Sequence, residues 1–546
     1  MGQNFYSGHF GPFSFVFFRT YLAILIPISL LPVLFIDDTK PKECKCLYVV
    51  LLMAFFWFFQ VIPIVVTAFI PLVLFPLFEI QSTSQVSPNY LTASNSLFLA
   101  GLIFAIAVED SGLDKRIAIT FLNVTGPKPK RLLFGIMAVT GFLSLLVSNT
   151  ATTAMMIPVL KSILDSTSIK KNAMMQEKYT NGLLLAVAYS SNIGGTGFLT
   201  GSPPNLVAPA LLEKKFGSAA GISFIKWAMF AIPLMLVNLC FAGIWLYFSF
   251  GFSKYEKAEI VQVEGEEITQ DLAYEKAAKI LKNKKKELGS ITGREALITI
   301  IFSTTVLLWF FKTPKIFPGW SNLFPEVSVA SSTPAFLMII IMFLIPRKFV
   351  FWPFIKWNDI PQSSEALITW KAVEKKLPWG IMFLLGGGTA MAEGTIESGL
   401  SKWLVKGLRS SMSSITPWVI NLIFCFIMTF GTEFMSNTAA ASIMVPILVD
   451  LSTVMCESPL YFVTSTVICS SYAFMVPVAT APNALVYDAS SISQFHMMKI
   501  GFVMNIICII TTTIAINLYG GLVFTFSPLP EWMMEYYRVH NDTIFS

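Results

Sequence analysis

Two short polar triplets interrupt the apolar sequence of this chain. The first, SNT at 148–150, precedes ATTAMMIP, and the second, SNT at 436–438, precedes AAASIMVP. Their hydroxyl and amide groups can donate hydrogen bonds to an anion or offer oxygen ligands to a cation. Small residues and a helix start directly after each triplet would aim free N–H groups at the same point. Each triplet therefore predicts an ion site.

Further oxygen ligands are expected around each triplet. Ser144 and Thr432 lie four residues before the two triplets and are suited to hold a cation. GSPPN, which begins at Gly201, and ATAPN, which begins at Ala479, break two other helices with proline. The breaks would free the carbonyls of these two residues to coordinate a cation.

The expected site has no basic side chain. Lysine and arginine are absent from the four elements that carry the motifs, residues 144–160, 190–212, 430–449 and 471–487. Sodium ions bound by hard oxygen ligands could supply the missing positive charge for an anion. Binding of the two ions would then be coupled by electrostatics alone.

Structural interpretations of the same residues stay open. Ser, Asn and Thr also cap helices and allow close helix packing, but two copies, each paired with a broken helix, favour a functional site. Glu433 has no acidic counterpart at Leu145 in the first copy. Its carboxylate could tune sodium affinity, carry a proton or make structural hydrogen bonds.

The elements that position these motifs are those of a membrane protein. The 546 residues are 55% hydrophobic and 13% charged, whereas a soluble domain carries about 25% charged residues. The apolar stretches predict an all-α polytopic membrane protein with about eleven transmembrane helices. The modest net charge of +6 lies in loops and argues for membrane topology rather than a nucleic-acid partner.

The motifs belong to a longer internal repeat. LFLAG from Leu97 matches MFLLG from Met382, and EDSGL from Glu109 matches IESGL from Ile396. Counting the spans makes the two copies run in opposite directions, which is the inverted repeat of secondary transporters. The triplets then lie in two re-entrant hairpins, whose tips need protein or a water-filled cavity around them.

Basic residues in the loops indicate the orientation. Three basic regions, 115–131, 254–294 and 347–376, are expected to be cytoplasmic. The amino terminus then lies inside and the carboxyl terminus outside. Asn541 begins an Asn-Asp-Thr acceptor for glycosylation, which is usable only on the outside.

These motifs resemble those of the divalent anion/sodium symporter family, the sodium-coupled di- and tricarboxylate and sulfate carriers. The similarity runs from about Phe56 to the last span and is carried by SNTATTAMMIP, GSPPNLV, TEFMSNTA, ATAPNALVY and LPWGIMFLLGGG. It implies a homodimer whose protomers each have a scaffold domain and a transport domain that moves as an elevator. The chain departs from the family at Gln60, where many animal relatives carry a charged residue, and at Ala481, where proline is common.

The resemblance also implies a division of the chain and specific site residues. The division is 1–110, scaffold spans and the start of repeat 1; 111–215, repeat 1 with hairpin 131–160 and broken helix 181–210; 216–378, scaffold spans with a cytoplasmic loop at 253–295; 379–500, repeat 2 with hairpin 415–449 and broken helix 460–487; and 501–546, the last span and an extracellular tail. The substrate would contact Ser148, Asn149, Thr150, Ser202, Ser436, Asn437, Thr438 and Thr480. One sodium would bind among Ser144, Ser148, Asn149 and Gly201, and another among Thr432, Asn437 and Ala479.

The expected function is sodium-coupled uptake of dicarboxylates such as succinate, or of citrate, across the plasma membrane. A sulfate carrier and a sodium-independent carboxylate exchanger of the same fold are the alternatives. Sodium is the expected coupling ion, and no organic cofactor is expected. An intramembrane hydrolase would need a nucleophile and base or a metal, and the sequence has no HExxH motif. A channel would need a continuous polar pore, whereas two opposed hairpins suit alternating access.

Overall fold

In the computed structural model most of the chain is helical. The described residues are 18–166, 173–217, 220, 222–256, 260–263, 266–312, 318–324, 326–327, 329–347, 365–400, 403, 415–526, 529 and 531–535. Asn541 lies outside them. One antiparallel pair of short strands, β1 (Ile260–Val263) and β2 (Glu266–Thr269), interrupts the helices of the 253–295 segment. A partly helical loop was expected there, and the strand pair was not.

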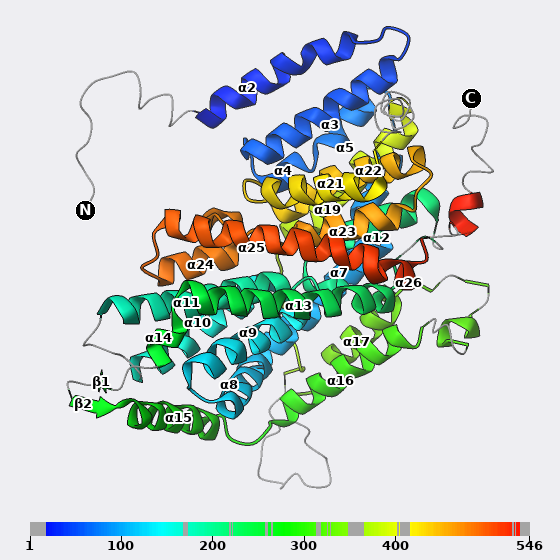
Figure 1. Cartoon of the computed structure of the whole chain (residues 1–546). Helices are drawn as coiled ribbons and strands as arrows, with labels where there is room; N and C mark the ends of the chain where they lie inside the picture. The colour runs from blue at the N-terminus through cyan, green and yellow to red at the C-terminus, as the bar shows by residue number, and fades with distance from the viewer. Residues whose placement is uncertain are drawn as a thin grey trace, which may run out of the picture.

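The amino-terminal helices begin at one end of the molecule, where α2 to α5 lie at the top of Figure 1, and α7 continues into its middle. They are α2 (Phe18–Leu30), α3 (Pro41–Phe59), α4 (Ile64–Thr67), α5 (Ile70–Leu77), α6 (Thr83–Val86) and α7 (Ala93–Ser111), with 3-10 turns η1 (Leu31–Phe35) and η2 (Ser87–Leu91). Helix α3 ends at Gln60, which has a left-handed backbone with φ 49° and caps the helix. Residues from this turn and from α7 reach the central cavity described below.

The first repeat forms a helical hairpin followed by a broken helix. Its helices are α8 (Leu113–Thr125), α9 (Pro129–Leu146), α10 (Asn149–Ser166), α11 (Ala173–Gly194) and α12 (Pro204–Phe216), with the 3-10 turn η4 (Leu199–Gly201) in the break. Proline in the first turn favours the start of α9 and of α12 because the ring presets helical φ. The Ser148 hydroxyl accepts the backbone N–H of Ala151 at 3.3 Å and so caps α10.

The second repeat has the same order of elements. They are α18 (Trp370–Lys376), α19 (Trp379–Glu397), α21 (Pro417–Gly431), α22 (Asn437–Val454), α23 (Pro459–Cys469), the 3-10 turn η8 (Pro477–Ala479) and α24 (Ala481–Ala489). Helices α7 and α19 each have 19 residues, and α10 and α22 each contain one proline, at matching positions Pro158 and Pro446. The repeat predicted from the sequence is therefore present in the order and breaks of the helices, although α23 with 11 residues is half as long as α11 with 22.

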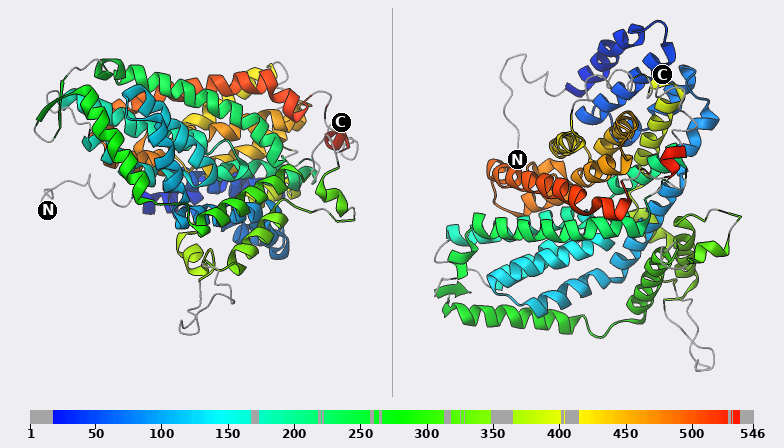
Figure 2. Two further views of the ribbon diagram at one scale, coloured as in Figure 1. Left: turned by 90° about the horizontal axis from the view of Figure 1, so that it is seen from below. Right: turned by 45° about the vertical axis from the view of Figure 1, so that its right-hand side comes forward.

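The remaining helices connect and cover the repeats. They are α13 (Phe224–Ser249), α14 (Phe252–Glu256), α15 (Gln270–Glu287), α16 (Gly293–Phe310), η6 (Trp320–Leu323), α17 (Ser332–Leu344), α25 (Gln494–Ala515), the π-helical turn η9 (Ile516–Gly520) and α26 (Gly521–Phe524). The long helices α13 and α25 lie side by side across the middle of the molecule, and α13 also packs on α11 (Figures 1 and 2). Amphipathic α8 was not expected from the sequence, and it packs between α9 and α15 at the lower end in Figure 1.

The apolar helices include long ones that could cross a membrane and shorter ones. Six helical stretches of the described chain are long and apolar enough to cross a membrane: Phe18–Phe35, Thr83–Ser111, Pro129–Leu146, Phe224–Ser249, Gly293–Phe310 and Gln494–Phe524. Shorter apolar helices lie at Ile64–Leu77, Ser332–Leu344, Pro417–Gly431, Asn437–Thr453 and Pro459–Cys469. Several expected spans are thus built from shorter pieces, as expected for broken helices.

Candidate functional site

Both polar triplets line one cavity of about 740 Å³. The predicted substrate and ion residues on its wall are Ser148, Asn149, Thr150, Gly201, Ser202, Ser436, Asn437, Thr438, Ala479 and Thr480. Ser144 and Thr432 do not line it, because both are fully buried directly behind the triplets. Segments 288 residues apart in the sequence therefore contribute to the same space, between the tips of the two hairpins.

The first hairpin tip gathers oxygen atoms around Ser144. Its hydroxyl oxygen lies 2.6 Å from Oδ1 of Asn149 and 2.7 Å from the carbonyl oxygen of Ser191. A hydroxyl has one hydrogen, so it can donate to only one of these two acceptors. The backbone of Gly195 comes close to this cluster, because a Cβ atom at this position would lie 2.5 Å from Oδ1 of Asn149. Only glycine leaves room for the asparagine side chain here. Such a set of close oxygen atoms with too few hydrogens suits a hard cation.

The second hairpin tip repeats this arrangement around Thr432. The Thr432 hydroxyl oxygen lies 2.7 Å from Oδ1 of Asn437 and 3.0 Å from the carbonyl oxygen of Ser470. The carbonyls of Ser191 and Ser470 were not predicted as ligands, because the sequence pattern pointed to Gly201 and Ala479 instead. Ser191 lies in the last turn of α11 and Ser470 directly follows α23, so both carbonyls lie at the helix breaks. The Ser191 carbonyl also accepts the backbone N–H of Gly195 at 3.1 Å.

Two asparagines hold the broken helices in shape. Asn205 donates its two amide hydrogens to the carbonyls of Gly195 and Phe198, at 2.9 and 2.8 Å. Asn483 does the same for Ala473 and Val476, at 2.8 and 3.2 Å. Both are the last residue of the GSPPN and ATAPN motifs, so the repeat itself contained the signal, although it was not interpreted in this way.

Four helices begin at the cavity. The first residues of α10, α12, α22 and α24 all belong to its lining. Helix N-termini carry free N–H groups and the positive end of the helix dipole, which favour a bound anion. A link between the repeats holds one of them, since Nδ2 of Asn192 on α11 donates to Oγ1 of Thr480, the N-cap of α24, at 3.1 Å. The site can therefore attract an anion without a basic side chain at these helix starts.

Glu433 supports the second hairpin through hydrogen bonds. Its carboxylate accepts the backbone N–H groups of Phe474 and Met475 at 2.8 and 3.0 Å through Oε1, and that of Val476 at 3.0 Å through Oε2. The amide of Asn505 donates to Oε1 at 2.8 Å. The carboxylate thus holds the chain after α23, and the structural hydrogen bonds considered from the sequence are present.

The other part of the lining comes from the turn after α3, from α7 and from the α18–α19 junction. Gln60, Glu109 and Lys376 supply its polar side chains. Nζ of Lys376 lies 3.0 Å from Oε1 of Glu109 and 3.8 Å from Oδ1 of Asp110. Among the described lining residues Lys376 is the one basic side chain. Sequence reasoning missed it because it lies outside the motifs.

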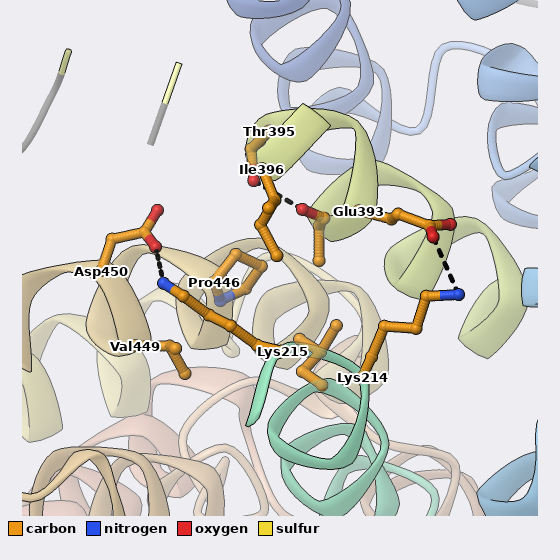
Figure 3. A pocket seen from close by; sticks show the side chains of 10 residues that line it. Lys214, Lys215, Glu393, Thr395, Ile396, Pro446, Val449 and Asp450 are labelled. Carbon is orange, nitrogen blue, oxygen red and sulfur yellow. Dashed lines mark hydrogen bonds and ion pairs between the residues drawn. The ribbon is translucent and has the colours of Figure 1, made fainter. Parts of the chain in front are cut away.

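The corresponding end of α19 is closed. A hollow of about 20 Å³ lies there between α12, α19 and α22. Two ion pairs surround it, Lys214 with Glu393 and Lys215 with Asp450 (Figure 3). Asn89 also donates to Glu393. The end of α7 thus borders the large cavity, whereas the matching end of α19 borders only this small hollow.

The described residues contain no group of three or more His, Cys, Asp or Glu side chains that could hold a metal ion. The cation ligands available at the hairpin tips are hydroxyl, amide and carbonyl oxygens, which suit a hard monovalent ion better than zinc or iron.

Apolar helices, two repeats with broken helices and a cavity between hairpin tips define a multi-pass membrane transport protein. A family model described as the sodium:sulfate symporter transmembrane region matches residues 14–526. The chain belongs to this family, and its members are transporters rather than enzymes.

Named relatives are similar over nearly the whole length. The chain is 36% identical to human solute carrier family 13 member 2, with 94% of the chain and 95% of the relative covered. It is 33% identical to the Na(+)/dicarboxylate cotransporter 3 of Rattus norvegicus, with 94% of each covered. It is also 33% identical to the Na(+)/citrate cotransporter of the same species, with 94% of the chain and 97% of the relative covered.

Solved structures support the fold alone. The antimetabolite efflux pump MtrF of Neisseria gonorrhoeae aligns with a TM-score of 0.53 at 12% identity, over 80% of this chain and 83% of its own. The YdaH transporter of Alcanivorax borkumensis aligns with a TM-score of 0.52 at 10% identity, over 80% and 88%. Both are membrane transporters.

Proposed function

We propose that the protein couples sodium influx to uptake of dicarboxylates of the succinate class, with citrate as a second substrate. The observation that carries this proposal is the oxygen cluster at each hairpin tip, where one hydroxyl hydrogen faces two acceptors. A sodium ion in each cluster would satisfy these oxygens and neutralise an anion held at the four helix N-termini. The dicarboxylate and citrate cotransporters among the relatives support the choice of substrate.

The sodium gradient can drive accumulation of the anion. Each tenfold gradient contributes about 1.4 kcal/mol per sodium ion. The membrane potential adds roughly 2.3 kcal/mol for each net charge that crosses 100 mV. Two sodium ions would therefore supply about 2.8 kcal/mol per tenfold gradient to the uphill movement of one dicarboxylate. Two sodium ions and one doubly negative dicarboxylate carry no net charge, so the membrane potential would contribute only if further sodium ions were coupled.

The mechanism that we propose is an elevator. In it the two hairpins are re-entrant, and they move with the broken helices against a scaffold that includes α3–α5, α7 and α16–α19. The sequence-based division placed α19, within 379–500, among the transport elements instead. Helices α13 and α25 pack on the motif-bearing helices α11, α9 and α21, so we assign them to the moving part, although the sequence-based division placed 216–378 in the scaffold. The cavity then represents the state open to one side, and the closed end of α19 represents the other side.

The proposed orientation places the open mouth in the cytoplasm. The mouth lies at the end of α7, next to the basic segments that contain Arg116 and Arg294, and loops rich in basic residues stay inside. The amino terminus would be cytoplasmic and the carboxyl terminus extracellular. The protein would lie in the plasma membrane as a homodimer.

Glycosidase treatment should then raise gel mobility through loss of a glycan at Asn541. A shift that survives Asn541→Gln would contradict this acceptor.

Uptake of labelled succinate, citrate and sulfate into cells, with sodium replaced by choline, tests the function. Saturable succinate uptake that is lost in choline is the expected result. Saturable uptake unaffected by choline would remove the sodium claim and leave a carboxylate exchanger, and uptake without saturation or counterflow would indicate a channel. Sulfate is the second candidate substrate, because the family description names it, and uptake of sulfate but not succinate would favour it.

A further inference from the structure

The charged residues of the cavity are unequally distributed. Glu433 lies on the hairpin side, where its carboxylate is taken up by four hydrogen bonds. Glu109 and Lys376 lie on the α7 side, where they bond each other. Their side chains keep 35% and 33% of their surface exposed, so both groups face the open space. Lys376 is thus accessible to an anion in the cavity.

The position of Lys376 is fixed relative to the mouth rather than to the hairpins. It is the last residue of α18, which packs against α7, and it bonds Glu109 of α7 at 3.0 Å. Helix α19, which directly follows, packs on α3, α4 and α5 but also on α12 and α22. Because α18 and the bond to Glu109 tie Lys376 to α7, its ammonium group stays at the end of α7 when the hairpins move. A substrate in the hairpin site would meet Lys376 only in the state in which the site faces this mouth.

The internal repeat provides a contrast. Lys376 precedes α19 and bonds an acid near the end of α7, and Asn89 precedes α7 and donates to Glu393 near the end of α19. Asn89 thus takes the place of Lys376, and its acceptor Glu393 lies about one turn before Ile396, the residue that matches Glu109. Glu393 there also receives Lys214 from α12. Of these two contacts made by the residue that precedes the long helix, the one at the end of α7 has the basic side chain.

From these observations we infer that Lys376 is a substrate-contacting residue at the cytoplasmic mouth, where it binds a carboxylate of the anion as the anion enters or leaves. This inference rests on the proposed carboxylate transport. The ammonium group has three donors, so it can keep its bond to Glu109 and still bind one substrate oxygen. Glu109 competes for the same charge and weakens the contact. Lys376 then attracts the anion to this side of the membrane, and Glu109 limits how long it is held.

Substitutions of the two partners should act in opposite directions. In inside-out vesicles, whose cytoplasmic face is exposed to the bath, Lys376→Gln should raise the KM for labelled succinate by roughly three- to fivefold, the range of a partly exposed charged contact. Glu109→Gln should lower it. The KM for uptake into intact cells, which reports the external face, should stay nearly unchanged in both variants. A purely structural ion pair would instead give the same sign of effect for both partners.

Matched variants complete the test. Lys376→Arg keeps the charge and should retain most of the affinity, and Lys375→Gln, in the same helical turn but outside the cavity lining, should behave as the unmodified protein. An unchanged cytoplasmic KM in Lys376→Gln, or an equal rise on both faces, would overturn the inference. If Lys376→Gln does not reach the membrane, Glu109→Gln decides, because an unchanged or raised cytoplasmic KM there also contradicts it. Sodium-dependent uptake that persists in either case would leave the proposed function standing.

Discussion

The two repeats build the same oxygen cluster on different supports. In each, a hydroxyl four residues before the triplet lies close to an asparagine Oδ1 and to a carbonyl at the end of a broken helix. In the second repeat the Glu433 carboxylate holds the chain after the break, whereas the matching Leu145 of the first repeat packs where a Cβ at Gly197 would lie. The oxygen cluster is therefore duplicated, while the means of fixing the broken helix differs.

The repeats also differ in the size of the space beside the matching ends of α7 and α19. The end of α7 borders a cavity of about 740 Å³, and the matching end of α19 is closed by α12 and α22 around a hollow of about 20 Å³. Two halves of similar structure in different environments can exchange these environments, which is the basis of alternating access in inverted repeats. The two halves therefore differ in how they pack against their neighbours and not in the oxygen clusters at their tips.

The largest effect is expected from removing the shared amide of the two tips. Asn149→Ala or Asn437→Ala should abolish uptake of labelled succinate while surface expression remains normal, because each change removes an amide oxygen from a cluster that is proposed to hold sodium. Asn517→Ala, which lies outside the cavity lining and whose side chain bonds Tyr461, serves as the control. Normal kinetics in both cavity variants would contradict the assigned site.

The second largest effect is expected at Glu433, whose carboxylate supports the broken helix only in the second repeat. Glu433→Gln should lower the free energy of unfolding by about 1–3 kcal/mol, because the new amide presents hydrogens to backbone N–H groups that need an acceptor. Thermal unfolding of the purified protein in detergent measures it. Leu145→Met in the first repeat conserves volume and should change little. Equal stability of Glu433→Gln and the unmodified protein would show that the two supports do not differ.

A moderate effect is expected from the buried hydroxyls. Ser144→Ala and Thr432→Val should each raise the sodium concentration for half-maximal uptake by about fivefold. Each change removes one oxygen contact to the proposed sodium ion, and a contact as strong as a hydrogen bond contributes about 1 kcal/mol. Thr429→Val, one turn before Thr432 and also buried, should leave the sodium dependence unchanged. A response in only one of the two variants would mean that the clusters are not equivalent.

The smallest effect should come from Lys214 at the end of α19. The pair Lys214–Glu393 retains 35% and 23% of its side-chain surface, so Lys214→Gln should cost less than about 1 kcal/mol of stability. Lys215 and Asp450 retain only 6% and 11%, and Lys215→Gln should cost more because it leaves a buried carboxylate unpaired. Melting temperatures of the two variants compare them directly, and the reverse order would contradict this account of the closed end.

Much of the site could be predicted from the sequence because it is written twice. The SNT triplets, Ser144 and Thr432 were found from spacing alone, since helix capping and packing rarely require the same polar residues twice in apolar surroundings. The carbonyls of Ser191 and Ser470 in the two oxygen clusters were missed because a backbone oxygen leaves no residue-type signal. Lys376 was missed because its position at the cavity depends on tertiary packing of α18 against α7. The strand pair β1–β2 lies in a charged segment without strong hydrophobic periodicity, which gave no indication of strands.

Equilibrium binding of labelled succinate to the purified protein, measured against sodium concentration with choline as replacement, tests the central claim most directly. If cations at the two hairpin tips neutralise the anion, binding should vanish in choline and rise with sodium with a Hill coefficient above one, and Asn149→Ala and Asn437→Ala should each flatten the curve. Binding of succinate with the same affinity in choline and in sodium would contradict the account.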